Sequence, residues 1–125
     1  MDANTTGTSN VGLGHDALGT NVAGDQSVAV GYEALLTQNP SGNADMDNTA
    51  VGYRAGRAIT TGTANSLYGS DAGTAITTGA NNTLVGFRAG DAITTAGFNT
   101  ALGWNGLGAN TSGANNVGLG YAAMQ

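Results

Sequence analysis

The chain has 125 residues, of which 22 are glycine, one is proline and none is cysteine, and its formal net charge is −5 at pH 7. Leu, Ile, Val and Phe number only 9, 3, 7 and 2, which is too few for a conventional layered core, and the absence of cysteine excludes a disulfide framework or a thiolate metal site. Three arginines against eight acids do not form the basic face that nucleic-acid binding needs, and no apolar run is long enough for insertion into a membrane.

Seven segments of one pattern follow one another along the chain, which we therefore expect to be a single repeat domain spanning residues 1–125. Each segment contains a shared glycine, and these are Gly14, Gly31, Gly52, Gly69, Gly86, Gly103 and Gly120. Their spacing is 17 residues, except for one interval of 21 between Gly31 and Gly52. The extra residues fall within 37–47, which contains the only proline, and predict a loop pushed out of one coil.

Each unit contains two short segments of strand-like composition. In 48–53, Thr, Val and Tyr stand at alternate positions, as a strand requires, and 58–61 is short and β-branched. A helix is excluded because a glycine recurs in every unit, at a cost of about 1 kcal/mol each. Short strands at a fixed period predict an all-β fold, a parallel β-solenoid or β-roll of about seven coils, with equivalent residues stacked about 4.8 Å apart.

Stacking turns each position of the unit into a column of side chains. The residues before the shared glycine are apolar throughout, and we expect them to form the core; they are Leu13, Val30, Val51, Tyr68, Val85, Leu102 and Leu119. The residues after it, expected on the same face, are His15, Tyr32, Tyr53, Ser70, Phe87, Trp104 and Tyr121. Packing is the simpler interpretation of this column, and contact with carbohydrate through Tyr32, Tyr53 and Trp104 is the alternative.

The opposite face of the strand carries mostly Ala or Gly, as at Ala50 and Gly52. Small residues let backbones approach closely, so we expect this face to line a threefold axis between chains. The shared glycines are themselves expected to mark close backbone approach.

Two polar columns are predicted to be structural. Asn48, Asn65, Asn82 and Asn99 are expected to form a ladder of stacked amides. Glu33, Arg54, Asp71 and Arg88 alternate in sign, so each arginine is expected to lie near two acids, although exposed pairs contribute only about 0–1 kcal/mol each. On this hypothesis, Asp71 is the best-paired acid of the chain.

No catalytic, cofactor-binding or metal site is predicted, and we do not expect an enzyme. His15 is the only histidine, and neither a cluster of acids nor a nucleophile–base pair accompanies it. Gly12-Leu13-Gly14 lacks the third glycine and the strand–helix context of a dinucleotide-binding motif. The pairs Thr60/Thr61, Thr77/Thr78 and Thr94/Thr95 resemble threonine ladders of ice-binding proteins, but adjacent residues of a strand are expected to point to opposite faces.

The unit N-T-A-V-G-Y-x-A-G/L, followed by N/I-T-T-G, resembles the repeats of bacteriophage tail fibres and related tail proteins. Residues 26–31, Q-S-V-A-V-G, are similar to the core of the head repeats of trimeric autotransporter adhesins. The period of 17 is longer than the adhesin unit, and the second segment departs from the phage pattern where it contains Ala-Ile-Thr-Thr-Gly.

The resemblance implies a homotrimer of parallel β-rolls, intertwined or side by side, in a virion or at a bacterial cell surface. It also implies attachment to a host surface, including its carbohydrate. We therefore expect a non-catalytic structural and attachment segment of a tail fibre or similar surface fibre. A bacterial trimeric adhesin head is the alternative, and an ice-binding solenoid is a third possibility.

Overall fold

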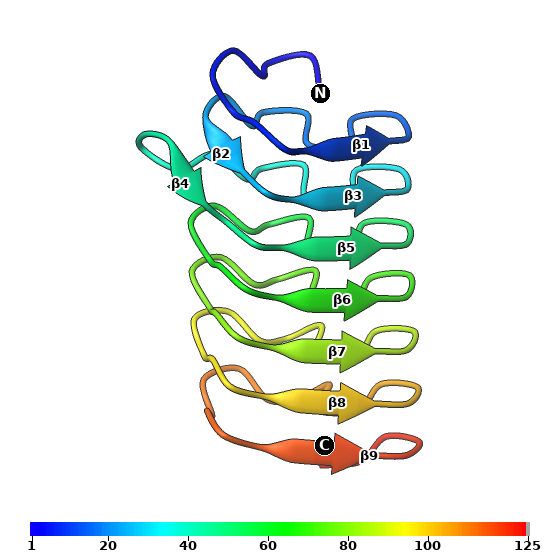
Figure 1. Cartoon of the computed structure of the whole chain (residues 1–125). Helices are drawn as coiled ribbons and strands as arrows, with labels where there is room; N and C mark the ends of the chain where they lie inside the picture. Colours follow the sequence, from blue (N-terminus) through cyan, green and yellow to red (C-terminus); the bar gives the residue numbers. More distant parts are fainter. Residues whose placement is uncertain (125) are drawn as a thin grey trace.

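The computed structural model describes residues 1–124 and shows seven three-residue strands stacked in one parallel sheet (Figure 1). In sheet order the strands are β1 (Val11–Leu13), β3 (Val28–Val30), β5 (Thr49–Val51), β6 (Ser66–Tyr68), β7 (Thr83–Val85), β8 (Thr100–Leu102) and β9 (Val117–Leu119). Each strand is joined to the next by one complete turn of the chain, so the protein is a parallel β-solenoid of about six turns with a 17-residue spacing. The predicted fold class is confirmed at this level.

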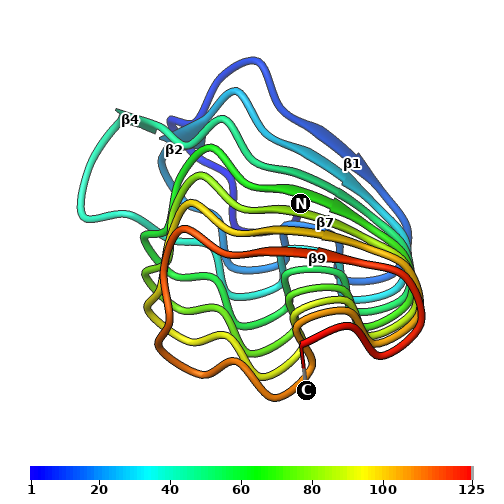
Figure 2. The ribbon, with the colours of Figure 1, turned by 90° about the horizontal axis from the view of Figure 1, so that it is seen from below.

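The longer interval forms a projecting loop, as the sequence predicts. A short strand within this interval, β4 (Ala44–Asp45), pairs in parallel with β2 (Gly24–Asp25) of the preceding coil. The loop before β4 extends away from the stack in both views (Figures 1 and 2). The main sheet is undisturbed, because Val28 of β3 still pairs with Thr49 of β5.

The prediction of a second strand at 58–61 was wrong. This stretch consists of turns and bends, because the chain folds back on itself through residues of left-handed backbone conformation such as Arg54 (φ 55°) and Gly56 (φ 60°). The coils remain linked on this side by single hydrogen bonds, for example from the Thr60 N–H to the Thr77 carbonyl (2.9 Å). Only one side of each coil is therefore a regular strand.

The side chains of the strands face the opposite way from our expectation. The central residue of each strand faces inward, and Ala29, Ala50, Leu67, Leu84 and Ala101 are fully buried. The apolar residue before the shared glycine faces outward, so that Leu13 is 66% and Leu119 64% exposed. The prediction of a core from this column, and of a small-residue face on a threefold axis, is therefore corrected.

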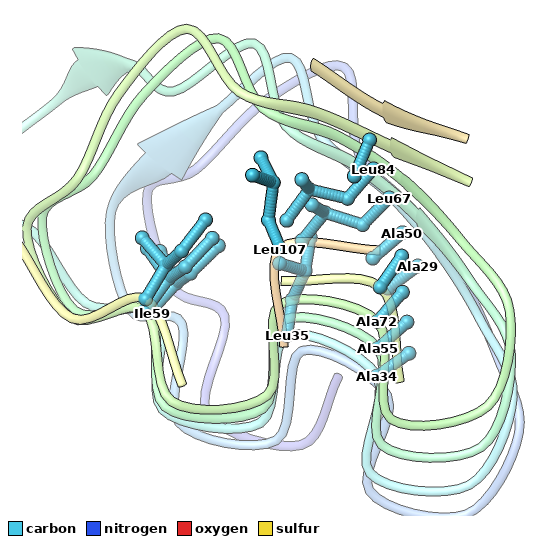
Figure 3. Close-up of a cluster of buried hydrophobic side chains, with 14 of the residues drawn as sticks. Ala29, Ala34, Leu35, Ala50, Ala55, Ile59, Leu67, Ala72, Leu84 and Leu107 are labelled. Carbon is cyan, nitrogen blue, oxygen red and sulfur yellow. The ribbon is translucent and has the colours of Figure 1, made fainter. Parts of the chain in front are cut away.

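The physical reason is the narrowness of the coil. An alanine from the turn that follows the strand packs near the inward-facing central residue of the strand. An isoleucine from the other side of the coil fills the remaining interior (Figure 3). These partners form further columns, of Ala34, Ala55, Ala72 and Ala89 and of Ile59, Ile76 and Ile93, all fully buried. One inward position per strand is enough to fill such an interior, and it is often a small residue.

The shared glycines lie where the backbones of successive coils almost touch. Gly52 has a φ of 141°, and a Cβ built on it would lie 2.4 Å from the Gly69 carbonyl oxygen. Neither the backbone angle nor the space admits a side chain. The predicted close backbone approach is confirmed.

Candidate functional site

The most conspicuous surface of the molecule is an apolar strip that runs over all seven strands. It consists of the first and third residue of each strand, and we call it the outer sheet face. Its members are Val11, Leu13, Val28, Val30, Thr49, Val51, Ser66, Tyr68, Thr83, Val85, Thr100, Leu102, Val117 and Leu119. None of them is buried. The third residues form a continuous apolar column, while the first residues are valine in β1, β3 and β9 and Thr or Ser in β5 to β8. A contiguous exposed apolar patch marks an interaction surface in soluble proteins.

The aromatic column lies beside this strip, at the bend after each strand. It forms two stacks, His15–Tyr32–Tyr53 and Phe87–Trp104–Tyr121, which Ser70 separates. The ring centroids are 5.4 Å apart for both steps of the first stack, and 6.0 and 4.8 Å apart in the second. The rings pack on one another as expected, but at the surface rather than in a core, since Tyr32 is 41% and Trp104 43% exposed.

Stacking limits what these rings can offer to a sugar. Tyr32 lies between His15 and Tyr53, and Trp104 lies between Phe87 and Tyr121. A pyranose packs its C–H groups on the face of an aromatic ring, and both faces of these two rings are already covered. Tyr53 is in addition approached by the Arg54 guanidinium, 5.0 Å from its ring centroid. Tyr32 and Trp104 thus present mainly their edges to solvent, whereas Tyr53 has a stacked ring only on the side of Tyr32.

The asparagines form the predicted ladder, inside the coil. The Asn65 side-chain amide donates to Asn48 Oδ1 (3.1 Å) and to the Gly79 carbonyl (2.9 Å), while its backbone N–H also donates to Asn48 Oδ1 (3.0 Å). The same bonds to the preceding asparagine recur at Asn82 and Asn99. Because Asn48, Asn65, Asn82 and Asn99 are fully buried, their role is structural.

The expected Glu33–Arg54 pair of the charge column is present, and Arg57 joins it as a partner that we did not expect. Arg54 Nε donates to Glu33 Oε2 at 3.0 Å, and Arg57 Nε donates to the same oxygen at 2.7 Å. The hydrogen bond from Arg57 lowers the pKa of Glu33, with further contributions from Tyr32 and Arg54, against an opposing effect of burial. In return, the hydrogen bond to Glu33 raises the pKa of Tyr32. Glu33 is therefore an ion-paired carboxylate.

The prediction for Asp71 was wrong. Arg88 pairs with Asp91 of its own coil (2.6 Å), and the side-chain contact of Asp71 is a long one, 3.5 Å from the Ser70 hydroxyl. These column residues have left-handed φ angles at a tight turn, 57° for Asp71 and 55° for Arg88, so their side chains are not held in line up the stack. The three-residue spacing of Arg88 and Asp91 was visible in the sequence, whereas nothing there paired Arg57 with Glu33.

Both threonines of each pair lie toward solvent, contrary to the expected alternation, because 58–61 is not a strand. Thr60, Thr61, Thr94 and Thr95 are all exposed. The hydroxyl of the first threonine is engaged, since Thr60 Oγ1 donates to the Thr77 carbonyl (3.2 Å) and Thr94 Oγ1 to that of Thr111 (3.1 Å). The second threonine of each pair points outward.

A hollow of about 330 Å³ opens at the C-terminal end of the stack, beside Leu107, Asn110 and Met124. It is the uncovered interior of the last coils and carries no acid or base among its lining residues. Among residues 1–124, no group of three or more His, Cys, Asp or Glu side chains is placed to hold a metal ion. The same residues form no helix with the length and apolar character that crossing a membrane requires.

Fold and surface together define a parallel β-solenoid repeat protein whose outer sheet face is apolar. Comparison of the chain with protein-family models, with curated proteins and with solved structures gave no match.

Proposed function

We propose that the chain is a non-catalytic structural and attachment segment of a bacteriophage tail fibre or a similar surface fibre, assembled as a side-by-side homotrimer. The observation that carries this proposal is the outer sheet face. The third residue of each strand on this face is aliphatic or aromatic along the whole stack, and the face sits on a rod whose interior needs none of its side chains. The resemblance of the repeat to those of phage tail fibres and trimeric adhesins suggests an assembly of three chains, in a virion or at a cell surface.

Association through this face has a clear driving force. Burial of apolar surface contributes roughly 25 cal/mol per Å², and Leu13, Leu102 and Leu119 each leave more than half of their surface in water, at 66%, 54% and 64%. The face extends along the rod axis, so copies that lie parallel bury it over its entire length. A closed ring of such copies leaves no apolar strip uncovered.

The acids favour a structural role over catalysis. Hydrolysis of a glycan requires two carboxyl groups on either side of one bond, one of them as an acid. Glu33 is bound by two arginines and Asp91 by Arg88. The lowered pKa of Glu33 suits an ion pair better than a general acid.

The proposal is tested by the molecular mass in solution. We expect sedimentation equilibrium at micromolar concentration to return three times the chain mass of 12.2 kDa. A Val51→Asp/Val85→Asp variant, charged on the outer sheet face, should be monomeric. Thr61→Asp/Thr78→Asp places the same charges on the other side of the coil and should remain trimeric. A wild-type mass of 12.2 kDa would overturn the proposed assembly.

Two other functions are distinguished by separate measurements. A bacterial adhesin head would share the assembly, and the full-length chain and its gene neighbourhood separate it from a phage fibre. An ice-binding solenoid is favoured only by the exposed second threonines, and the hydroxyls of Thr60 and Thr94 are already bonded to the backbone. An assay of ice recrystallisation decides this alternative.

A further inference from the structure

In one coil, the residue types before and after the shared glycine are the reverse of those in the other coils. The residue before the shared glycine is Val or Leu in six coils and Tyr68 in the coil of β6. The residue after the shared glycine carries a ring in six coils and is Ser70 in that same coil. The coil of β6 therefore has a large ring where its neighbours have an aliphatic side chain, and a small residue where they have a ring.

The small residue leaves a step in the aromatic column that matches one ring. Tyr53 and Phe87 flank Ser70 from the adjacent coils, two strand spacings or about 10 Å apart. Within the column, stacked rings are 4.8 to 6.0 Å apart. A single ring between Tyr53 and Phe87 would thus complete the column at its ordinary spacing.

Tyr68 of the same chain does not occupy this step. It lies on the outer sheet face, where it pairs in register with Val51 and Val85, and it is 42% exposed. Its ring is therefore more exposed than the half-buried side chains of Val51 and Val85 on either side. The molecule thus carries an exposed ring and an interruption of its stacked rings at the same height along its axis.

We propose that the Tyr68 ring of one copy fills the Ser70 step of a neighbouring copy, between that copy's Tyr53 and Phe87. This inference rests on the proposed trimer. Copies in a closed ring are related by rotation alone, so the coil of β6 in one copy lies at the height of the same coil in the next. Each copy gives one ring and receives one, and the aromatic column of each chain becomes continuous.

The contact would favour the closed ring over an open assembly in which each copy is shifted along the axis. Apart from this coil, the outer sheet face is a repeat of Val, Leu, Thr and Ser, so a slip by one coil would bury nearly the same surface. Such a slip would set the Tyr68 ring against Tyr53 or Phe87 instead of Ser70. Ring against ring at one position cannot be accommodated, so only one register satisfies all copies.

The experiment first places a ring at position 70 and then also removes the ring of Tyr68. Ser70→Tyr restores the aromatic pattern of the other coils, so we expect the single chain to fold, as checked by circular dichroism. On dilution without denaturant, the variant trimer should dissociate at a chain concentration about tenfold higher than that of the wild type. Tyr68→Val/Ser70→Tyr makes this coil like its neighbours and should return the trimer dissociation constant to within a few-fold of the wild type. Ser70→Ala is the matched control and should leave it unchanged.

Cross-linking tests the contact directly, because the chain contains no cysteine. Differently tagged Tyr68→Cys and Ser70→Cys chains are refolded together and treated with a short bismaleimide, and we expect a mixed-tag product. Leu119→Cys in place of Tyr68→Cys lies three coils away on the same column, about 14 Å along the axis, and should give little product. A wild-type monomer would refute the proposed trimer, whereas a wild-type trimer that Ser70→Tyr leaves intact would refute only this contact.

Discussion

The central coils and the flanking coils fill the same interior from opposite sides. In the coils of β6 and β7, the strand supplies a buried leucine, Leu67 or Leu84, and the turn opposite it has a glycine, Gly73 or Gly90. In the coils of β1, β3 and β8 the strand centre is Ala or Gly, and the turn carries Leu18, Leu35 or Leu107. The coil of β5 has small residues at both positions, Ala50 and Gly56, and the leucines of the adjacent coils reach this space. The two arrangements occupy one space, since a Cβ on Gly90 would lie 2.8 Å from Leu84 Cδ1.

The flanking arrangement has a conformational cost. Leu18, Leu35 and Leu107 adopt left-handed φ angles of 52°, 49° and 56°, which cost a residue with a side chain about 1–2 kcal/mol. Glycine adopts the same angle freely at Gly56, Gly73 and Gly90. The difference teaches that an inward position in this repeat is specified together with its partners across the coil and in the adjacent coils.

The largest effect should come from emptying the central type of coil. Leu84→Ala removes a fully buried side chain and should lower the free energy of unfolding by about 3 kcal/mol. Leu84→Ala/Gly90→Leu converts this coil to the flanking type and should recover part of the loss, limited by the left-handed backbone. Urea unfolding at one fixed chain concentration measures both. A double variant less stable than Leu84→Ala would break the proposed equivalence.

The asparagine ladder should matter most in its buried middle. Asn82→Ala leaves the Asn99 N–H, the Ala96 carbonyl and Asn65 Oδ1 without their side-chain partner. We expect a loss of about 2–3 kcal/mol in the free energy of unfolding. Asn116→Ala, at the partly exposed end of the ladder, should cost about 1 kcal/mol or less by the same reasoning. Equal losses at both sites would contradict the role of burial.

A smaller loss of stability is expected at the coil in which another residue pair replaces the asparagine of the ladder. At the coil of β3, Ser27 replaces the asparagine, and the buried Gln38 bonds both Ser27 Oγ (2.9 Å) and the Asn48 amide (3.0 Å). Gln38→Ile removes these bonds and should cost about 1–2 kcal/mol. Ser27→Asn/Gln38→Ile gives this coil the central pattern and should lose less. The thermal midpoints of the two variants give their order of stability. A double variant less stable than Gln38→Ile would show that an asparagine at position 27 does not replace the bonds of Gln38.

The smallest effect should come from the surface ion pairs, and it depends on pH. The lowered pKa of Glu33 means that its ionised form stabilises the fold. That stabilisation is complete above the ordinary glutamate value of 4.5 and is lost as the pH falls through the lowered value. Glu33→Gln should therefore reduce the melting temperature at pH 7, and the difference from the wild type should shrink in acid. Asp71→Asn, outside any ion pair, serves as the control and should change little at either pH.

The period was sufficient to predict a parallel stack, but it did not determine which face turns inward. Alternation in 48–53 defines two faces, and hydrophobicity favours the face of Val51, which is the outer one. The deciding quantity is the width of the coil, which the left-handed turn residues set and which composition does not reveal. A usable signal was present, however. Leucine at the strand centre coincides with glycine in the turn, at Leu67 with Gly73 and at Leu84 with Gly90.

The site was predictable in part for the same reason. Columns that lie on the strand or next to it, such as the asparagine ladder and the aromatic stacks, follow directly from the alignment of units. Ion pairs do not, because their side chains extend from a tight turn and choose partners within or beyond their own coil, as Arg57 and Arg88 do.

The projecting loop shows that chain length and register are independent in this fold. Val28 and Thr49 pair across the insertion as regularly as Thr49 and Ser66 pair without one. At the tip of the loop, Ser41 and Gly42 are exposed, and a Cβ on Gly42 would meet no atom within 4 Å. A foreign peptide inserted between them would be displayed at a fixed height on a rigid rod. The same insertion in successive coils would present copies of an epitope at intervals of about 4.8 Å, or any multiple of it.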